Sequence, residues 1–111
     1  MRVVTRHRPS DPAAFQELAA AALVALAAQP GFRSGELARS PDDASQWLFT
    51  TRWDDVGSMR RGMGSYDAKI ALGPVMPSAA DEASVFEVLL EAGPAGVRAA
   101  ASDLADRPAA E

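Results

Sequence analysis

Alternating apolar and polar residues near the start of the chain predict a short β-strand. In residues 3–8, Val3, Thr5 and His7 fall on one face and the intervening residues on the other. A period of two is the side-chain spacing of a strand. Pro9 ends the pattern, because proline has no N–H to donate to a neighbouring strand.

The following segment repeats its apolar residues at helical spacing. Asp11-Pro12 predicts the helix start, since aspartate caps free amides and proline suits the first helical position. Pro30-Gly31 predicts the end, because proline cannot extend a helix and glycine readily adopts the left-handed conformation. The apolar residues between these signals that recur three or four positions apart are Phe15, Leu18, Ala22 and Leu26.

Two further strands are predicted over residues 32–40 and 46–53, joined by a polar turn at 41–45. Four residues share one face of the second of these strands: Trp47, Phe49, Thr51 and Trp53.

A second helix is predicted to open at Asp54-Asp55 and to break within 62–65. The reason is that Gly57, Gly62 and Gly64 each lower helix stability by roughly 1 kcal/mol relative to alanine. A short helix over 66–72 follows. Residues 82–91 read as a last strand that is buried on both faces, because neither face is polar.

The order of these elements, β-α-β-β-α-β, predicts an α+β fold of the ferredoxin-like kind. A four-stranded antiparallel sheet would carry two helices on one face, within a domain at residues 1–92. Residues 93–111, rich in alanine and proline, read as a tail or a loosely packed helix.

The strand pattern also predicts a homodimer. We expect Trp47, Phe49, Trp53 and either Phe86 or Leu89 on the sheet face that the helices leave uncovered. An apolar patch of that size is rarely exposed on a monomer. A second copy packed sheet to sheet would cover it.

The charge and the residue types narrow the partners. The net charge of −4 and the scattered arginines argue against nucleic acid. One histidine and no cysteine argue against a zinc site, and we expect no metal, haem or flavin cofactor. The longest apolar run, 18–28, is too short to cross a bilayer, and the N-terminus lacks a signal-peptide run. We therefore expect a cytoplasmic protein without a membrane partner.

Three segments resemble the antibiotic biosynthesis monooxygenase family of the dimeric α/β-barrel superfamily. They are 30–37 with its Pro-Gly-Phe turn, 47–55 ending in tryptophan and two aspartates, and 85–89. The resemblance covers roughly residues 1–92. It implies a dimer with a small apolar cavity in each subunit. It also implies oxidation of electron-rich aromatics, such as quinols or anthrones, by O₂ without metal or flavin, and a related branch of the superfamily degrades haem.

The functional residues of the family are matched only in part. The anthrone-oxidising members are similar in placing a tryptophan at Trp53, but Phe49 and Met59 stand where they have asparagine and tyrosine. The asparagine, tryptophan and histidine of the haem-degrading members fall on His7, Gly62 and Leu72. Haem degradation is therefore not expected, because an axial iron ligand is lacking.

The candidate catalytic residues are His7 and Tyr66, either of which can move a proton. Trp53 would stack on an aromatic ring, and the other candidate substrate-binding residues are Met59, Met63 and Phe86. Together they would line a cavity between the sheet and the second helix. Each has a structural alternative: a half-exposed strand histidine, a tyrosine that anchors a loop, a tryptophan that fills the core and core methionines.

Two functions follow as hypotheses. The first is a cofactor-independent monooxygenase that acts on a small aromatic, quinol or polyketide-like substrate. The second is a non-catalytic protein of the same fold that binds a small apolar ligand, which the missing family residues favour.

Overall fold

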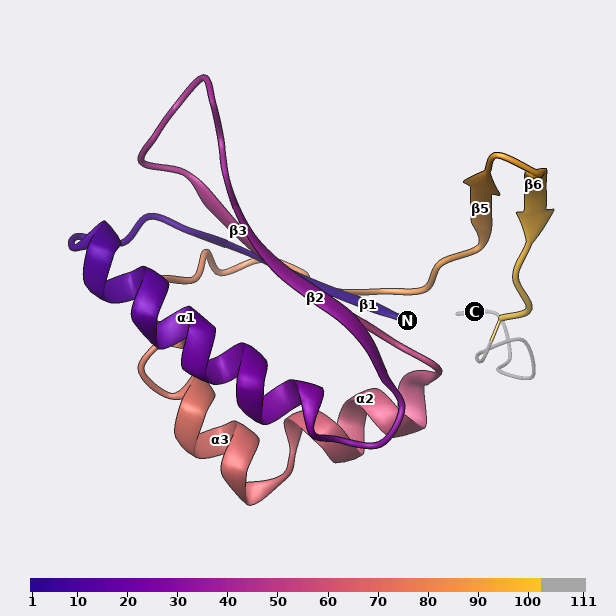
Figure 1. Cartoon of the computed structure of the whole chain (residues 1–111), viewed down its shortest axis with the longest axis horizontal. Coiled ribbons are helices and arrows are strands. Elements are labelled where there is room, and N and C mark those ends of the chain that lie inside the picture. Colours follow the sequence, from indigo (N-terminus) through magenta and orange to yellow (C-terminus); the bar gives the residue numbers. More distant parts are fainter. Residues whose placement is uncertain (103–111) are drawn as a thin grey trace, which may run out of the picture.

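The first residues of the chain form one of the two inner strands of the sheet. In the computed structural model, which describes residues 1–102, four antiparallel strands follow the order β2-β3-β1-β4 (Figure 1). This confirms the predicted ferredoxin-like fold. The strands are β1 (Arg2–His7), β2 (Phe32–Arg39), β3 (Trp47–Trp53) and β4 (Val85–Phe86).

The helices lie together on one side of the sheet (Figure 1). Their starts are capped as predicted: the Asp11 carboxylate accepts a bond from the Ala14 amide, and Asp55 forms a capping box with Ser58. No helix in the described part of the chain is long and apolar enough to cross a membrane. The helices are α1 (Pro12–Ala27), α2 (Val56–Met63) and α3 (Tyr66–Leu72), followed by a single 3₁₀ turn, η1 (Met76–Ser78).

The helices cover the aromatic face of the sheet, so the predicted orientation of β3 was wrong. Trp47, Phe49 and Trp53 are buried beneath the helices, and the Phe15 ring of α1 lies 6.1 Å from that of Trp47. Strand alternation shows which residues share a face, but it does not show which face receives the helices. Burial of the aromatic face is the more favourable choice.

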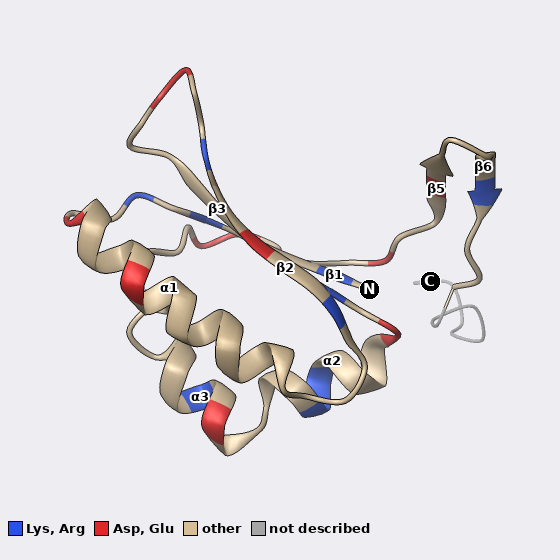
Figure 2. Cartoon of the chain, in the orientation of Figure 1, with Lys and Arg blue, Asp and Glu red and all other residues tan. Residues whose placement is uncertain are grey.

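The opposite face, called the open face below, is mixed rather than apolar. It carries Val4 and Arg6 from β1, Leu48 and Arg52 from β3, and Glu36 from β2. Basic and acidic positions are scattered over the helices, strands and loops (Figure 2). The open face therefore does not have the aromatic surface from which a dimer was predicted.

The predicted last strand, 82–91, is also wrong in its extent. Only β4 joins the sheet, and both of its residues are exposed. β5 (Leu90–Gly93) instead pairs with β6 (Gly96–Ala99) in a hairpin that stands apart from the sheet (Figure 1). Residues 93–99, predicted as part of the tail, form the last residue of β5, the turn and the second strand of this hairpin. Residues 103–111 of that tail lie outside the described part.

Candidate functional site

His7 ends β1 with its side chain beneath the helices, on the same face as Val3 and Thr5. Its side chain is almost completely enclosed, at 1% exposure. The ring lies 5.0 Å from that of Phe15, centroid to centroid, and 6.5 Å from that of Phe49. The only histidine of the chain is therefore held in an aromatic surrounding rather than half-exposed on a strand.

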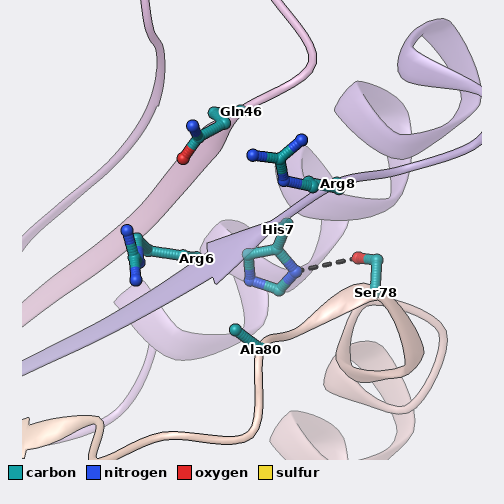
Figure 3. Close-up of a pocket in the computed structure, with 6 residues that line it drawn as sticks. All are labelled: Arg6, His7, Arg8, Gln46, Ser78 and Ala80. Carbon is teal, nitrogen blue, oxygen red and sulfur yellow. Dashed lines mark hydrogen bonds between the residues drawn. The ribbon is translucent and has the colours of Figure 1, made fainter. Parts of the chain in front are cut away.

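Both ring nitrogens of His7 contact hydroxyl groups. Nε2 lies 2.6 Å from Thr5 Oγ1, and Nδ1 lies 2.8 Å from Ser78 Oγ (Figure 3). Ser78 Oγ can also donate to the Val75 carbonyl at 3.1 Å. When it does, Nδ1 carries the ring proton; when Ser78 donates to Nδ1 instead, the proton lies on Nε2 and is donated to Thr5.

Burial lowers the pKa of His7, because an enclosed imidazolium loses its hydration. Within residues 1–102 no carboxylate bonds to the ring to oppose this effect, and the groups that contact its nitrogens are the hydroxyls of Thr5 and Ser78. The ring is therefore neutral at pH 7, the state in which an imidazole can accept a proton.

A hollow of about 270 Å³ opens beside this histidine (Figure 3). Arg6 is held by Glu82 through two bonds of 2.8 and 3.1 Å. Arg8 is held more loosely, 3.4 Å from Ser45 Oγ and 3.7 Å from Asp43 Oδ2. We call this the His7 hollow; its lining residues are Arg6, His7, Arg8, Gln46, Ser78 and Ala80.

A sequence model of the antibiotic biosynthesis monooxygenase family matches residues 2–69, more than half of the chain. The chain belongs to this family. The match spans β1 through the first half of α3 and thus includes His7 and Gln46, but not Ser78 or Ala80. A comparison with curated protein sequences found no match.

Solved structures of the same fold are similar over most of their length. SnoaB, a cofactor-independent oxygenase from Streptomyces nogalater, has 21% identity and a TM-score of 0.65, over 79% of this chain and 93% of that one. A protein from Mycobacterium tuberculosis has 21% identity and a TM-score of 0.65, over 83% and 97%. A conserved protein from Methanosarcina mazei has 16% identity and a TM-score of 0.63, over 76% and 84%.

Trp53, which the family resemblance singles out, lies at the other end of β1 from His7. Its side chain is fully buried, its ring lies 5.2 Å from that of Phe32, and its indole N–H donates to Thr51 Oγ1 at 3.0 Å. Its backbone N–H bonds to the Met1 carbonyl, whereas His7 is paired with Trp47. Trp53 therefore fills the core in the single chain.

The other predicted site residues are also apart. Met59 is buried in the core and Met63 packs against it. Tyr66 is 78% exposed at the start of α3, and Phe86 is 48% exposed on β4. Of the six residues, only His7 lines the hollow, so the structure does not gather them around one cavity.

Four polar residues of the hollow were not predicted from the sequence: Arg6, Arg8, Gln46 and Ser78. Two of them could have been found from the sequence, because Arg6 and Arg8 directly flank His7. Ser78 could not: it lies 71 positions from His7, and the loop that carries it returns beside β1 through a bridge between His7 and Ala79. Among the described residues, no three His, Cys, Asp or Glu side chains gather as a metal site would require.

Burial of His7 predicts a pH dependence of stability. In the unfolded chain the histidine takes up a proton near pH 6.5, whereas in the fold it resists protonation. The unfolded state therefore binds more protons as the pH falls through 6.5, and the free energy of unfolding decreases.

Urea unfolding at pH 7, 6 and 5 should show this decrease in the native protein and a flatter profile in His7→Gln. Carboxylates have ordinary pKa values below 5, so they contribute little in this range. Equal slopes in the two proteins would contradict the assignment of the pH dependence to His7.

Proposed function

We propose that this chain is a cofactor-independent monooxygenase that acts on an electron-rich, hydroxylated aromatic such as a quinol or an anthrone. The observation that carries the proposal is the neutral, buried His7 bonded at 2.8 Å to Ser78, whose side chain lines an open hollow. Membership of the family and the structural likeness to an oxygenase that needs no cofactor support it.

His7 is too enclosed to touch a substrate, so Ser78 is the proposed point of contact. A substrate hydroxyl would give its proton to Ser78 Oγ while the Ser78 proton moves to Nδ1 of His7. This step uses the tautomer in which the ring proton lies on Nε2 and is donated to Thr5. The resulting imidazolium would donate to two hydroxyl oxygens, which offsets part of the cost of its burial.

The deprotonated aromatic is the reductant in the steps that follow. It can pass an electron to O₂, so the protein need only bind the substrate, remove its proton and limit the access of water. One oxygen atom enters the product and the other leaves as water with two substrate hydrogens. An anthrone methylene thereby becomes a carbonyl, with no external reductant.

Oxygen uptake with a panel of anthrones and quinols tests the proposal. One O₂ should be consumed per substrate, and Ser78→Ala and His7→Gln should each lower the rate about 100-fold, a typical loss for a proton-transfer group. Tyr66→Phe is the matched control, because this phenol lies outside the hollow and is 78% exposed. Loss of activity in Tyr66→Phe with full activity in His7→Gln would assign the base to Tyr66 instead.

The second candidate function, a binding protein without catalysis, is favoured by Phe49 and Met59, which occupy positions where the anthrone-oxidising relatives have polar residues. Trp47 pairs with His7 across β1 and β3, so an aromatic bound in the hollow should change tryptophan fluorescence. A fluorescence change with no oxygen uptake across the panel would support this second function and contradict the first.

We also propose that the chain forms a homodimer through its open face and hairpin. The hairpin exposes Leu90 and Val97, and Phe86 is exposed on β4 beside it. An isolated two-stranded hairpin is barely stable in water. This one is tied to the sheet by Glu91, whose carboxylate lies 2.6 Å from Arg52 of β3. The same carboxylate lies 3.3 Å from Arg98 within the hairpin. A second copy would supply the surface that these apolar residues lack.

Light scattering at micromolar concentration should therefore give twice the chain mass of 11.6 kDa. Aspartate at Leu90 and Val97 should shift the protein to monomer, because each introduced charge would have to be buried at the interface. Aspartate at Val24 and Ile70, which are equally exposed but on the helices, should leave the dimer intact. A monomeric native protein would overturn the proposal.

A further inference from the structure

The His7 hollow does not stand alone. A second hollow of about 410 Å³ lies next to it, at the end of the open face that carries the turn between β2 and β3. Arg6 and Gln46 line both hollows, so the two meet at these side chains. Arg52, which holds the hairpin, pairs with Arg2 at the opposite end of β1. The joint groove therefore lies at the opposite end of the sheet from the hairpin.

The His7 hollow is rich in hydrogen-bond donors. Arginine side chains carry N–H groups and no acceptor, so a ligand beside Arg6 and Arg8 has to bring acceptor oxygens. Charge-assisted bonds from a guanidinium to an anionic oxygen are shorter and stronger than neutral ones. The chemistry of this wall thus favours a carboxylate or a comparable anion.

Arg8 is the arginine with capacity for such a ligand. Arg6 is held by both Glu82 oxygens, whereas Arg8 has only a long bond to Ser45 and a 3.7 Å approach to Asp43. The Asp43 carboxylate already accepts from the Ser45 amide at 3.0 Å, the Ser45 hydroxyl at 2.6 Å and the Gln46 amide at 3.2 Å. Arg8 can therefore turn to a ligand without leaving an unpaired carboxylate behind.

The second hollow offers apolar walls. Ala38, Pro41 and Leu48 line it, together with Trp47, over whose ring the Arg39 guanidinium lies at 5.3 Å. Such walls suit the flat hydrocarbon part of an aromatic ligand. The two hollows together form a groove with a polar end and an apolar end.

We propose that this groove binds an aromatic acid, with its rings against Leu48 and Pro41 and its carboxylate on Arg8. The inference rests on the proposed function, because it takes the substrate of the His7 hollow to be an aromatic acid. It narrows that substrate from any quinol or anthrone to one that carries an acidic group. The same Arg8 charge would stabilise the anion that forms when Ser78 accepts the substrate proton.

Calorimetric titration of the intact protein with 2-naphthoate and its neutral isostere naphthalene-2-carboxamide tests the inference. Loss of one charge-assisted bond corresponds to about a tenfold weaker affinity, so 2-naphthoate should bind about tenfold more tightly than the amide. Arg8→Gln should abolish that preference and Arg8→Lys should retain part of it. Arg60→Gln, the same change of charge at an exposed position on α2, should have no effect.

Three results would overturn the inference: equal affinity for acid and amide, unchanged binding in Arg8→Gln, or an equal loss in Arg60→Gln. Inorganic phosphate that competes with 2-naphthoate at equimolar concentration would show a general anion site and also contradict it. Because 2-naphthoate has no oxidisable hydroxyl, its binding is independent of turnover. Tight binding without oxygen uptake therefore rejects only the monooxygenase proposal, and uptake without an acid preference rejects only this inference.

Discussion

Replacing Trp53 with alanine is expected to lower the free energy of unfolding by about 3–5 kcal/mol, the usual cost of truncating a buried aromatic side chain. Trp53 is fully buried, its ring lies against Phe32, and its N–H bond to Thr51 is made inside the core. The backbone of Gly62 packs directly against the Trp53 ring, so closely that a Cβ at position 62 would collide with it. Truncation of Trp53 would therefore leave a cavity that Gly62, without a side chain, cannot fill.

Urea unfolding measures this effect, and Tyr66→Ala is the control. Tyr66 is 78% exposed, so its truncation should change the free energy of unfolding by less than about 0.5 kcal/mol. Trp53→Phe should fall between the two, since it keeps an aromatic ring but loses the bond to Thr51. A loss below about 1 kcal/mol in Trp53→Ala would show that the tryptophan is not a core residue, and would revive its role as a wall of the substrate site.

The local signals in the sequence were sufficient for the helices. Asp11-Pro12 predicts the start of α1, and the glycines around Gly62 predict the break between α2 and α3. Caps and breaks depend on neighbours within a few positions, where the sequence contains the whole cause. The strand order followed from these elements because few topologies connect them.

The errors arose where the outcome depends on distant parts of the chain. Alternation placed Trp47 and Trp53 on one face, but only helix packing decides that this face is buried. The apolar run 85–90 looked like one strand, yet Leu90 pairs with Ala99 and leaves the sheet. Short apolar runs are compatible with several partners, so the sequence alone does not select one.

The candidate site shows the same limit. His7 could be singled out because a lone histidine on a strand is conspicuous, and the strand period placed it on one face with Val3 and Thr5. Which face the helices cover was not predictable from that period. Ser78 ends the 3₁₀ turn η1 in a segment without periodicity, and the hollow exists only because this segment returns beside β1. Tyr66 and Phe86 were chosen for their chemistry, but the fold places both of them outside the hollow.

The Pro-Gly-Phe turn is the most distinctive part of the family resemblance. Its glycine is required for a physical reason, and replacing it should cause the second large loss of stability. Gly31 has a φ of 84°, a left-handed conformation that glycine adopts without strain. A Cβ at this position would collide with the Ser58 side chain, whose hydroxyl would lie only 2.6 Å away. The Gly31 carbonyl also accepts the Asp54 amide at 2.8 Å. The turn thereby joins the end of α1 to the start of α2.

Gly31→Ala is expected to lower the free energy of unfolding by about 2–4 kcal/mol, the sum of backbone strain and overpacking. Gly93→Ala is the control, because Gly93 has open space around it and no left-handed φ. The double variant Gly31→Ala/Ser58→Gly separates the two causes. Removal of the Ser58 side chain relieves the collision but not the strain, so the double variant should lose less stability than the two single variants added together. If the stability losses of the two single variants simply add in the double variant, backbone strain is the whole cause. The close approach of Gly31 to Ser58 would then not be the reason for glycine at this position.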